Sequence, residues 1–159
     1  MGYHDDLLNL AFDLVDENRG FTQADVRRAV STAYYALFHL LVSETTLNWS
    51  RDSSRNALGR MFDHGLMKKV SSRVADPKRT PFAGEDPAAV SGLRLVADAF
   101  VQLQNARHIA DYDNGKSWSL WEAIEEVVRS LNAFEAWDKI KHSDIAQEYL
   151  VSLLIRPRD

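Results

Sequence analysis

The strongest constraint on the fold is a long stretch, residues 23–46, in which apolar residues recur at helical spacing. One wide face of such a helix carries Val26, Ala29, Val30, Ala33, Leu37 and Leu41. Small residues alternate there with tyrosine and phenylalanine, a mixture that lets a second helix approach closely. Thr22, with Asp25 three positions later, supplies an N-cap. The stretch therefore predicts a long helix packed against other helices.

The same periodicity predicts further helices along the rest of the chain. They are expected at residues 5–18, 54–74, 88–112, 119–141 and 143–155. Their ends coincide with boundary residues: Gly20 stops the first helix, and Asp86 followed by Pro87 starts the helix at 88–112. Ser119 and Glu122 form a capping box. No strand pattern is longer than a few residues, so the chain is predicted to be all-helical.

The expected architecture is an antiparallel bundle of four or five helices with a short extra C-terminal helix. A length of 159 residues suits one domain, so residues 1–159 are expected to form a single unit with its core at about 5–141. Most connections are short enough for neighbouring helices to pack side by side. The exception is "DPKRTPFAGEDP" (76–87), whose length makes it a candidate lid or binding loop.

Composition narrows the function classes. The chain has no cysteine, which excludes disulfides, thiolate nucleophiles and cysteine metal ligands and fits a reducing cytoplasm. No apolar run approaches the ~20 residues that a membrane span needs. The start "MGYHDDLLNL" is acidic and unlike a signal peptide. A cytoplasmic protein without membrane contact is expected.

Charge is distributed unevenly. The net charge is −4, but residues 51–79 hold eight basic and three acidic residues, so that segment is +5 and the rest is −9. Such a segment can steer a phosphate backbone or an acidic partner. The candidates for RNA or phosphate contact within it are Lys68, Lys69, Lys78 and Arg79. The alternative is a solvated helix face.

Several familiar chemistries have no motif here. The sequence lacks a glycine-rich phosphate loop, a histidine pair spaced for zinc, the paired Glu-x-x-His motifs of di-iron bundles and a nucleophile elbow. No metal and no cofactor are therefore expected.

Two segments together resemble a known family. The first is "VRRAVSTAYYALFHLL" (26–41) and the second is "ARHIADYDNG" (106–115). In this order and at this separation they resemble HEPN domains, and most narrowly the small stand-alone prokaryotic members. In that subgroup one helix reads Arg-x-x-x-Ser-x-Ala-Tyr-Tyr-Ala-x-Phe-His, and a later helix ends in Ala-Asp-Tyr after an Arg. The segment "ALGRMFDHGLMKK" (57–69) also resembles the part between them, and the resemblance covers roughly residues 5–135.

The residues that match the motifs follow from the alignment of these segments. In the first they are Arg27 or Arg28, Ser31, Ala33, Tyr34, Tyr35, Ala36, Phe38 and His39, and in the second Arg107, Ala110, Asp111 and Tyr112. The resemblance implies a four- or five-helix bundle that pairs into a dimer. Many HEPN proteins are metal-independent endoribonucleases of toxin–antitoxin or phage-defence systems, and many small ones are encoded beside a minimal nucleotidyltransferase.

The family's usual catalytic pattern is an Arg followed by a polar residue and, after four to six residues in all, a His. Cutting RNA without metal needs a base, an acid and a cation for the phosphate, and His and Arg suit these roles. Here Arg107 and the polar His108 are present, but Tyr112 stands where the catalytic His is expected. An unperturbed Tyr is a poor base at neutral pH.

Candidate site residues follow from this comparison. In the catalytic interpretation Arg107 holds phosphate, and His108 or Tyr112 transfers protons. His39 is a further candidate, because Ser31, Tyr35 and His39 share one helix face. Asp111, Tyr35 and Ser31 would support them.

Each candidate also has a structural interpretation. Arg107 and Asp111 are four apart, the spacing of an intrahelical ion pair, and His108 and Tyr112 can stack in the same way. His39 lies in an aromatic stretch, where a hydrogen-bonded core histidine is expected.

Two functions therefore stay open. One is an RNA-directed protein of a toxin–antitoxin or phage-defence system, a weak or degenerate metal-independent endoribonuclease working as a homodimer. The other is a non-catalytic dimeric adaptor or nucleotide-binding module that partners a nucleotidyltransferase or a larger effector. A third hypothesis is that a partner adds nucleotides to Tyr112.

Overall fold

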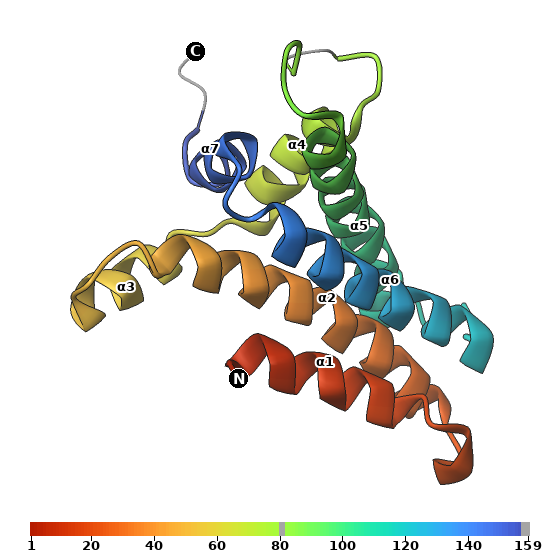
Figure 1. The fold of residues 1–159 in the computed structure, drawn as a ribbon. Helices are drawn as coiled ribbons and strands as arrows, with labels where there is room; N and C mark the ends of the chain where they lie inside the picture. Colours follow the sequence, from red (N-terminus) through yellow and green to blue (C-terminus); the bar gives the residue numbers. More distant parts are fainter. Residues whose placement is uncertain (80–81, 157–159) are drawn as a thin grey trace. The chain divides into compact units, whose positions relative to one another are not determined.

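The computed structural model describes residues 1–79 and 82–156, and these residues are helical with connecting turns and loops (Figure 1). The elements are α1 (Tyr3–Leu14), the 3-10 helix η1 (Glu17–Arg19), α2 (Gln23–Thr46), α3 (Asp52–Gly59), α4 (His64–Ala75), α5 (Pro87–Tyr112), α6 (Leu120–Ile140) and α7 (Asp144–Ser152). No strand occurs within the described ranges, so the all-α prediction is confirmed.

The long helices begin where their capping residues predict. At α2, the backbone N–H of Asp25 donates to Thr22 Oγ1 (3.2 Å) and the N–H of Thr22 donates to the Asp25 carboxylate (3.0 Å). The same reciprocal pair joins Ser119 and Glu122 at α6, at 3.1 and 2.9 Å. Both boxes satisfy N-terminal amides that have no partner inside the helix.

The expected single helix at 54–74 is wrong, because this segment forms two helices, α3 and α4. The break is explained by Asp63, whose carboxylate accepts the N–H of Leu66 at 2.8 Å and caps a new helix. A capping aspartate four residues after Gly59 was the available sequence signal.

The expected helix at 5–18 is also wrong at both ends. The helix α1 begins at Tyr3 and stops at Leu14, after which Asp16 caps the separate turn η1 by accepting the N–H of Asn18 (2.9 Å). Gly20 follows with a φ of +69°, a conformation that favours glycine. The last helix is shorter than the expected 143–155, and the proline at position 157 lies outside the described residues.

The described residues divide into two compact units. The first unit takes residues 1–40 and 99–134, and the second unit takes the described residues of 41–98 and 135–156. Each is described by itself below. The expectation of one single domain stays a prediction.

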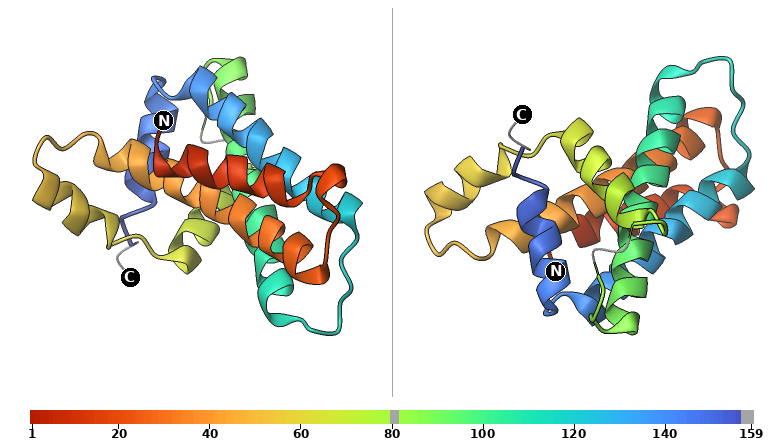
Figure 2. Two further views of the ribbon diagram at one scale, coloured as in Figure 1. Left: turned by 90° about the horizontal axis from the view of Figure 1, so that it is seen from below. Right: turned by 90° about the horizontal axis from the view of Figure 1, so that it is seen from above.

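In the first unit, consecutive helical segments alternate in direction. Tyr3 at the start of α1 contacts His39 far along α2, with ring centroids 4.9 Å apart, so these helices run antiparallel. Figure 1 and the left view of Figure 2 show α1 lying along α2. Ser130 of α6 donates to the carbonyl of Ala33 at 2.9 Å from a buried position. The apolar face expected on α2 is buried, including Val26, Ala29, Val30, Ala33 and Leu37.

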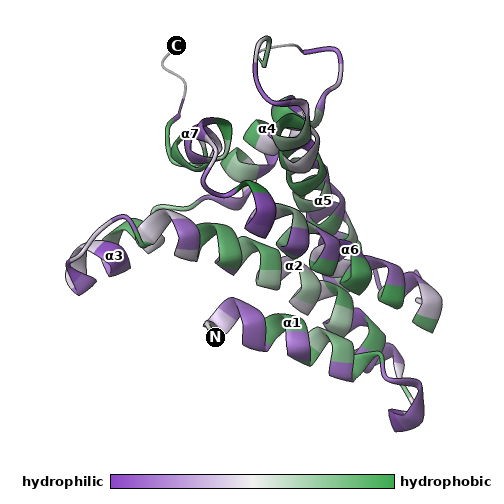
Figure 3. Cartoon of the chain, viewed as in Figure 1, coloured by the Kyte–Doolittle hydropathy of each residue, from purple (hydrophilic) through white to green (hydrophobic). Residues whose placement is uncertain are grey.

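The second unit has its own core around α7. Tyr149 is buried and its hydroxyl lies 2.6 Å from Ser71 Oγ on α4. Burial raises the pKa of Tyr149 well above its usual range, so the phenol stays neutral. Its ring also lies 6.5 Å from that of Trp137 on α6. Apolar residues recur along each of the longer helices, with polar residues between them (Figure 3).

Candidate functional site

The candidate site lies in the first unit, where the two motif segments meet. We call Ser31, Tyr34, Tyr35, Arg107 and Asp111 the Arg107 cluster. The guanidinium carbon of Arg107 lies 5.1 Å from the ring centroid of Tyr34 and 5.7 Å from that of Tyr35. Both distances suit a cation–π interaction. The arginine side chain is only 13% exposed, so α2 and α5 hold the cation largely away from solvent.

A carboxylate balances this cation. Arg107 Nη1 lies 3.7 Å from Asp111 Oδ2, four residues along the same helix. The Ser31 hydroxyl donates to the same carboxylate oxygen at 3.4 Å. The expected intrahelical ion pair is therefore present. Arg107 Nε is buried and has no hydrogen-bond partner within the described part of the chain.

Tyr34 forms the floor of the cluster. Its side chain is fully buried, and its ring lies 5.5 Å from that of Phe100 and 5.2 Å from that of Tyr35. Burial raises the pKa of Tyr34 well above its usual range, and the nearby charge of Arg107 opposes that rise. The phenol therefore stays protonated near neutral pH and is no base.

Arg27 fixes the end of α5 on α2, a role that the sequence interpretation missed. Its Nη1 donates to the carbonyls of Ala110 and Asp113, both at 2.9 Å, and its Nη2 donates to the carbonyl of Lys116. The last carbonyls of a helix lack partners inside the helix, so a guanidinium satisfies them well. This side chain holds the "DYDNG" turn in place.

Gln23 does the same for the start of α6. Its amide nitrogen donates to the carbonyl of Trp118 at 2.6 Å, and its amide oxygen accepts the N–H of Trp118 at 2.9 Å. A sequence signal existed: Gln23, Arg27 and Ser31 are spaced by four on one face of α2.

His108 and Tyr112 lie on another face of α5. Their ring centroids are 5.1 Å apart, so the expected stacked pair is present. Both residues are exposed, Tyr112 at 67%. Successive helix positions are about 100° apart, so His108 and Tyr112 lie about 100° and about 140° around the helix from Arg107.

His39 lies among aromatic rings on α2. Its ring is 4.9 Å from that of Tyr3, 5.2 Å from that of Phe38 and 6.5 Å from that of Tyr35. The residue is half-buried. Tyr35 thus neighbours both His39 and Arg107.

The four basic candidates belong to the second unit. Lys68 and Lys69 lie on α4, the first half-buried and the second exposed. Lys78 and Arg79 are exposed in the turn that follows, where Asp76 accepts the N–H of Lys78 at 2.9 Å. The expected loop at 76–87 includes positions 80 and 81, which lie outside the described residues.

The cluster places one cation, the Arg107 guanidinium, between α2 and α5. The residues that hold Arg107 are two phenols and a carboxylate that is already paired with it. In the described ranges, no three His, Asp or Glu side chains gather so that they could hold a metal ion. Nor does any helix there have the length and apolar character needed to cross a membrane.

Comparisons with known proteins give no assignment. No family model matches the sequence, and neither a curated protein nor a solved structure matches it.

Proposed function

We propose that the chain is a non-catalytic, HEPN-type helical module that acts as a homodimer and partners a nucleotidyltransferase or a larger effector. The two motifs that resemble the family support this proposal, because their residues contact one another. Arg27 binds the carbonyl of Ala110, Ser31 donates to Asp111, and Tyr34 lies beneath Arg107. The dimer and the partner are implied by the resemblance.

One observation carries the non-catalytic part of the proposal: the guanidinium of Arg107 already contacts other side chains of the fold. A metal-independent ribonuclease needs an arginine whose guanidinium is free to bind the phosphate in the transition state. Here that group lies against two tyrosines, is 13% exposed and has Asp111 at 3.7 Å. A phosphate would have to compete with this carboxylate for the same cation.

The net charge of the first unit also disfavours RNA binding. The residues of the first unit include six basic and eleven acidic side chains, a balance of −5. A polyanion binds through clustered Lys and Arg, and an acidic surrounding repels it. The second unit, with thirteen basic and twelve acidic residues, is nearly neutral at +1.

RNA cleavage in EDTA tests the proposal. Wild type, Arg107→Met and the control Arg129→Met would be incubated with total RNA and with short oligonucleotides, and their masses in solution measured by light scattering. Arg129 is a suitable control because it is also a helical arginine paired with carboxylates, Glu125 and Glu126. We expect a dimer mass and no cleavage by any of the three. Cleavage by wild type that disappears only in Arg107→Met would overturn the non-catalytic assignment.

A gain-of-function variant sharpens this test. Tyr112→His restores the family's spacing between Arg and His, with Arg107 left in place. We expect no cleavage, because Arg107 stays paired with Asp111 at 3.7 Å and remains largely buried against α2. Arg107-dependent cleavage by Tyr112→His would instead identify a complete phosphate site that lacks only its acid–base residue.

A second candidate function is the weak endoribonuclease of a toxin–antitoxin or phage-defence system. The exposed His108–Tyr112 pair favours it, because an imidazole at the end of α5 is open to a substrate. In that case cleavage in EDTA would need His108 and would fall by at least tenfold in His108→Gln.

A further inference from the structure

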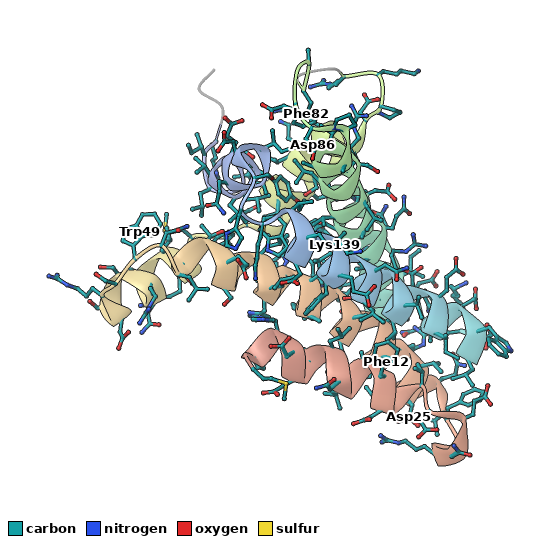
Figure 4. All side chains as sticks on the ribbon, in the orientation of Figure 1. Phe12, Asp25, Trp49, Phe82, Asp86 and Lys139 are labelled. Carbon is teal, nitrogen blue, oxygen red and sulfur yellow. The ribbon has the colours of Figure 1, made fainter. Side chains whose placement is uncertain are left out.

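A cavity in the second unit is formed by the turn before α5 and the first turns of that helix. It is open to solvent, has a volume of about 460 Å³ and is lined by Phe82, Ala83, Glu85, Pro87, Val90, Ser91 and Arg94. Small-molecule sites in proteins have comparable volumes and are mainly apolar, with a few polar groups that orient the ligand. Phe82 and Asp86, at the two ends of the turn, are labelled in Figure 4.

The turn that shapes this cavity is well defined by its backbone. The N–H of Glu85 donates to the carbonyl of Phe82 at 3.1 Å, and Gly84 has a φ of +86°, where glycine is favoured. Asp86 then accepts the N–H of Ala88 at 3.3 Å and caps α5. Because an acidic residue already occupies the helix N-terminus, that terminus is no anion site, and any anion in the cavity must find another cation.

Arg94 is the cation that lines the cavity. Its Nη2 donates to the carbonyl of Arg79 at 3.0 Å, and its guanidinium carbon lies 5.8 Å from the ring centroid of Phe82. Its Nε is buried and has no hydrogen-bond partner among residues 1–79 and 82–156. Among the ion pairs of the described residues, none includes Arg94. The guanidinium is therefore held in place by a ring and a carbonyl, with its charge not matched by a carboxylate.

The other lining residues restrict what such a cation can bind. Phe82, Pro87 and Val90 offer apolar surface, and the Ser91 hydroxyl can donate one hydrogen bond. Glu85 is also part of the lining, so a second negative charge on the ligand would be repelled. This combination matches one negative charge on an apolar body, and it disfavours a phosphate dianion.

We propose that this cavity binds a small monocarboxylate with an apolar body. The fork of Arg94 receives the carboxylate, since guanidinium and carboxylate groups match in geometry. The ring of Phe82 and the aliphatic groups of Pro87 and Val90 cover the apolar part. The site is separate from the Arg107 cluster and does not depend on the proposed function.

Calorimetric titration of the full chain tests this proposal with three probes. They are 3-phenylpropionate, its neutral analogue 3-phenylpropionamide, and adenosine 5′-monophosphate as a phosphate of similar size. We expect 3-phenylpropionate to bind at least tenfold more tightly than either of the others. Arg94→Met should weaken that binding at least tenfold, and Arg73→Met, which removes an exposed arginine of α4, should leave it unchanged.

The wild type could overturn the proposal by not binding 3-phenylpropionate, by binding the amide equally well, or by binding the nucleotide more tightly. Retention of full affinity by a folded Arg94→Met would overturn it as well. Should that variant not fold, the backbone amide NMR shifts of the wild type locate the binding site instead. Addition of 3-phenylpropionate must then shift the resonances of residues 82–94 most. Shifts centred elsewhere contradict the proposed site.

Discussion

Two arginines of α5, Arg94 and Arg107, are both partly withdrawn from solvent, but different groups stabilise their charges. Both have a buried Nε for which the described residues supply no hydrogen-bond partner, and both lie against aromatic rings. Arg107 in the first unit has a carboxylate, Asp111, at 3.7 Å. Arg94 in the second unit has the carbonyl of Arg79 and lines a cavity.

The difference shows that the arginine within the family motif need not be the arginine whose charge is free to bind a ligand. Withdrawing a charge from water is unfavourable unless another group compensates it. Arg107, which the family resemblance marks as catalytic, is already compensated within the fold. Arg94 lies outside both motifs, and its guanidinium charge is left for a ligand carboxylate to pair with, as we propose. Variants of these two arginines, and of Arg27, which donates to three backbone carbonyls, test this contrast.

The largest effect is expected for Arg27→Met. Arg27 donates to three carbonyls around the end of α5, and hydrogen bonds from a charged donor contribute more than neutral ones. We expect the free energy of unfolding to fall by about 2–3 kcal/mol in urea denaturation. The neighbouring Arg28 is exposed and serves as the matched control. Arg28→Met should change stability by less than about 0.5 kcal/mol, and equal losses in the two variants would contradict the assignment.

Arg107→Met should have the next largest effect. The substitution keeps much of the length but removes two cation–π contacts and the partner of Asp111, so we expect a loss of about 1–2 kcal/mol. A double-mutant cycle with Asp111→Asn measures their coupling. A free energy of coupling of zero would mean that the carboxylate does not balance this cation, and the contrast with Arg94 would fail.

Arg94→Met should change stability least among the three arginines. It loses one hydrogen bond to a carbonyl but also removes a buried nitrogen to which no described residue hydrogen-bonds, so the net change should stay below about 1 kcal/mol. Its effect should appear in ligand binding instead. A stability loss as large as that of Arg107→Met would show that Arg94 is structural.

A smaller effect is expected from Glu122, a half-buried carboxylate of the first unit. The hydrogen bond from Lys116 and the N–H of Ser119 lower the pKa of Glu122 from 4.5 to about 2. A pKa that folding lowers contributes stability above the unfolded value, and that stability is lost as pH falls through the folded value. The stability difference between wild type and Glu122→Gln should therefore be constant above pH 4.5 and shrink towards pH 2. A difference that does not change between pH 5 and about 2 would contradict this linkage.

Much of the fold was predictable because local signals and periodicity agreed. The capping pairs Thr22–Asp25 and Ser119–Glu122 and the proline at position 87 place three long helices correctly. The errors in helix boundaries arose where a capping aspartate interrupts a stretch of helical periodicity. Asp63 caps a new helix inside a stretch that otherwise reads as one, and Asp16 starts a 3-10 turn where the apolar pattern fades.

The site was predictable only in part. The spacings of Arg107–Asp111 and His108–Tyr112 gave their pairings, because side chains four apart share a helix face. The contacts of Arg27 with the end of α5 were not predictable, because they depend on how two distant helices pack. The cavity at Arg94 depends on the fold of a loop, which sequence periodicity does not describe.

Contacts within the fold already bind the Arg107 guanidinium, and we expect them to prevent it from binding phosphate. The most direct test of this expectation is the arginine Nε–H region of the nitrogen–proton NMR spectrum, recorded in EDTA while a short single-stranded RNA is added. We expect the Arg107 resonance, identified by its loss in Arg107→Met, to stay unchanged up to millimolar RNA. A saturable shift of that resonance, absent for Arg129, would contradict the account and restore the Arg107 cluster as an RNA site.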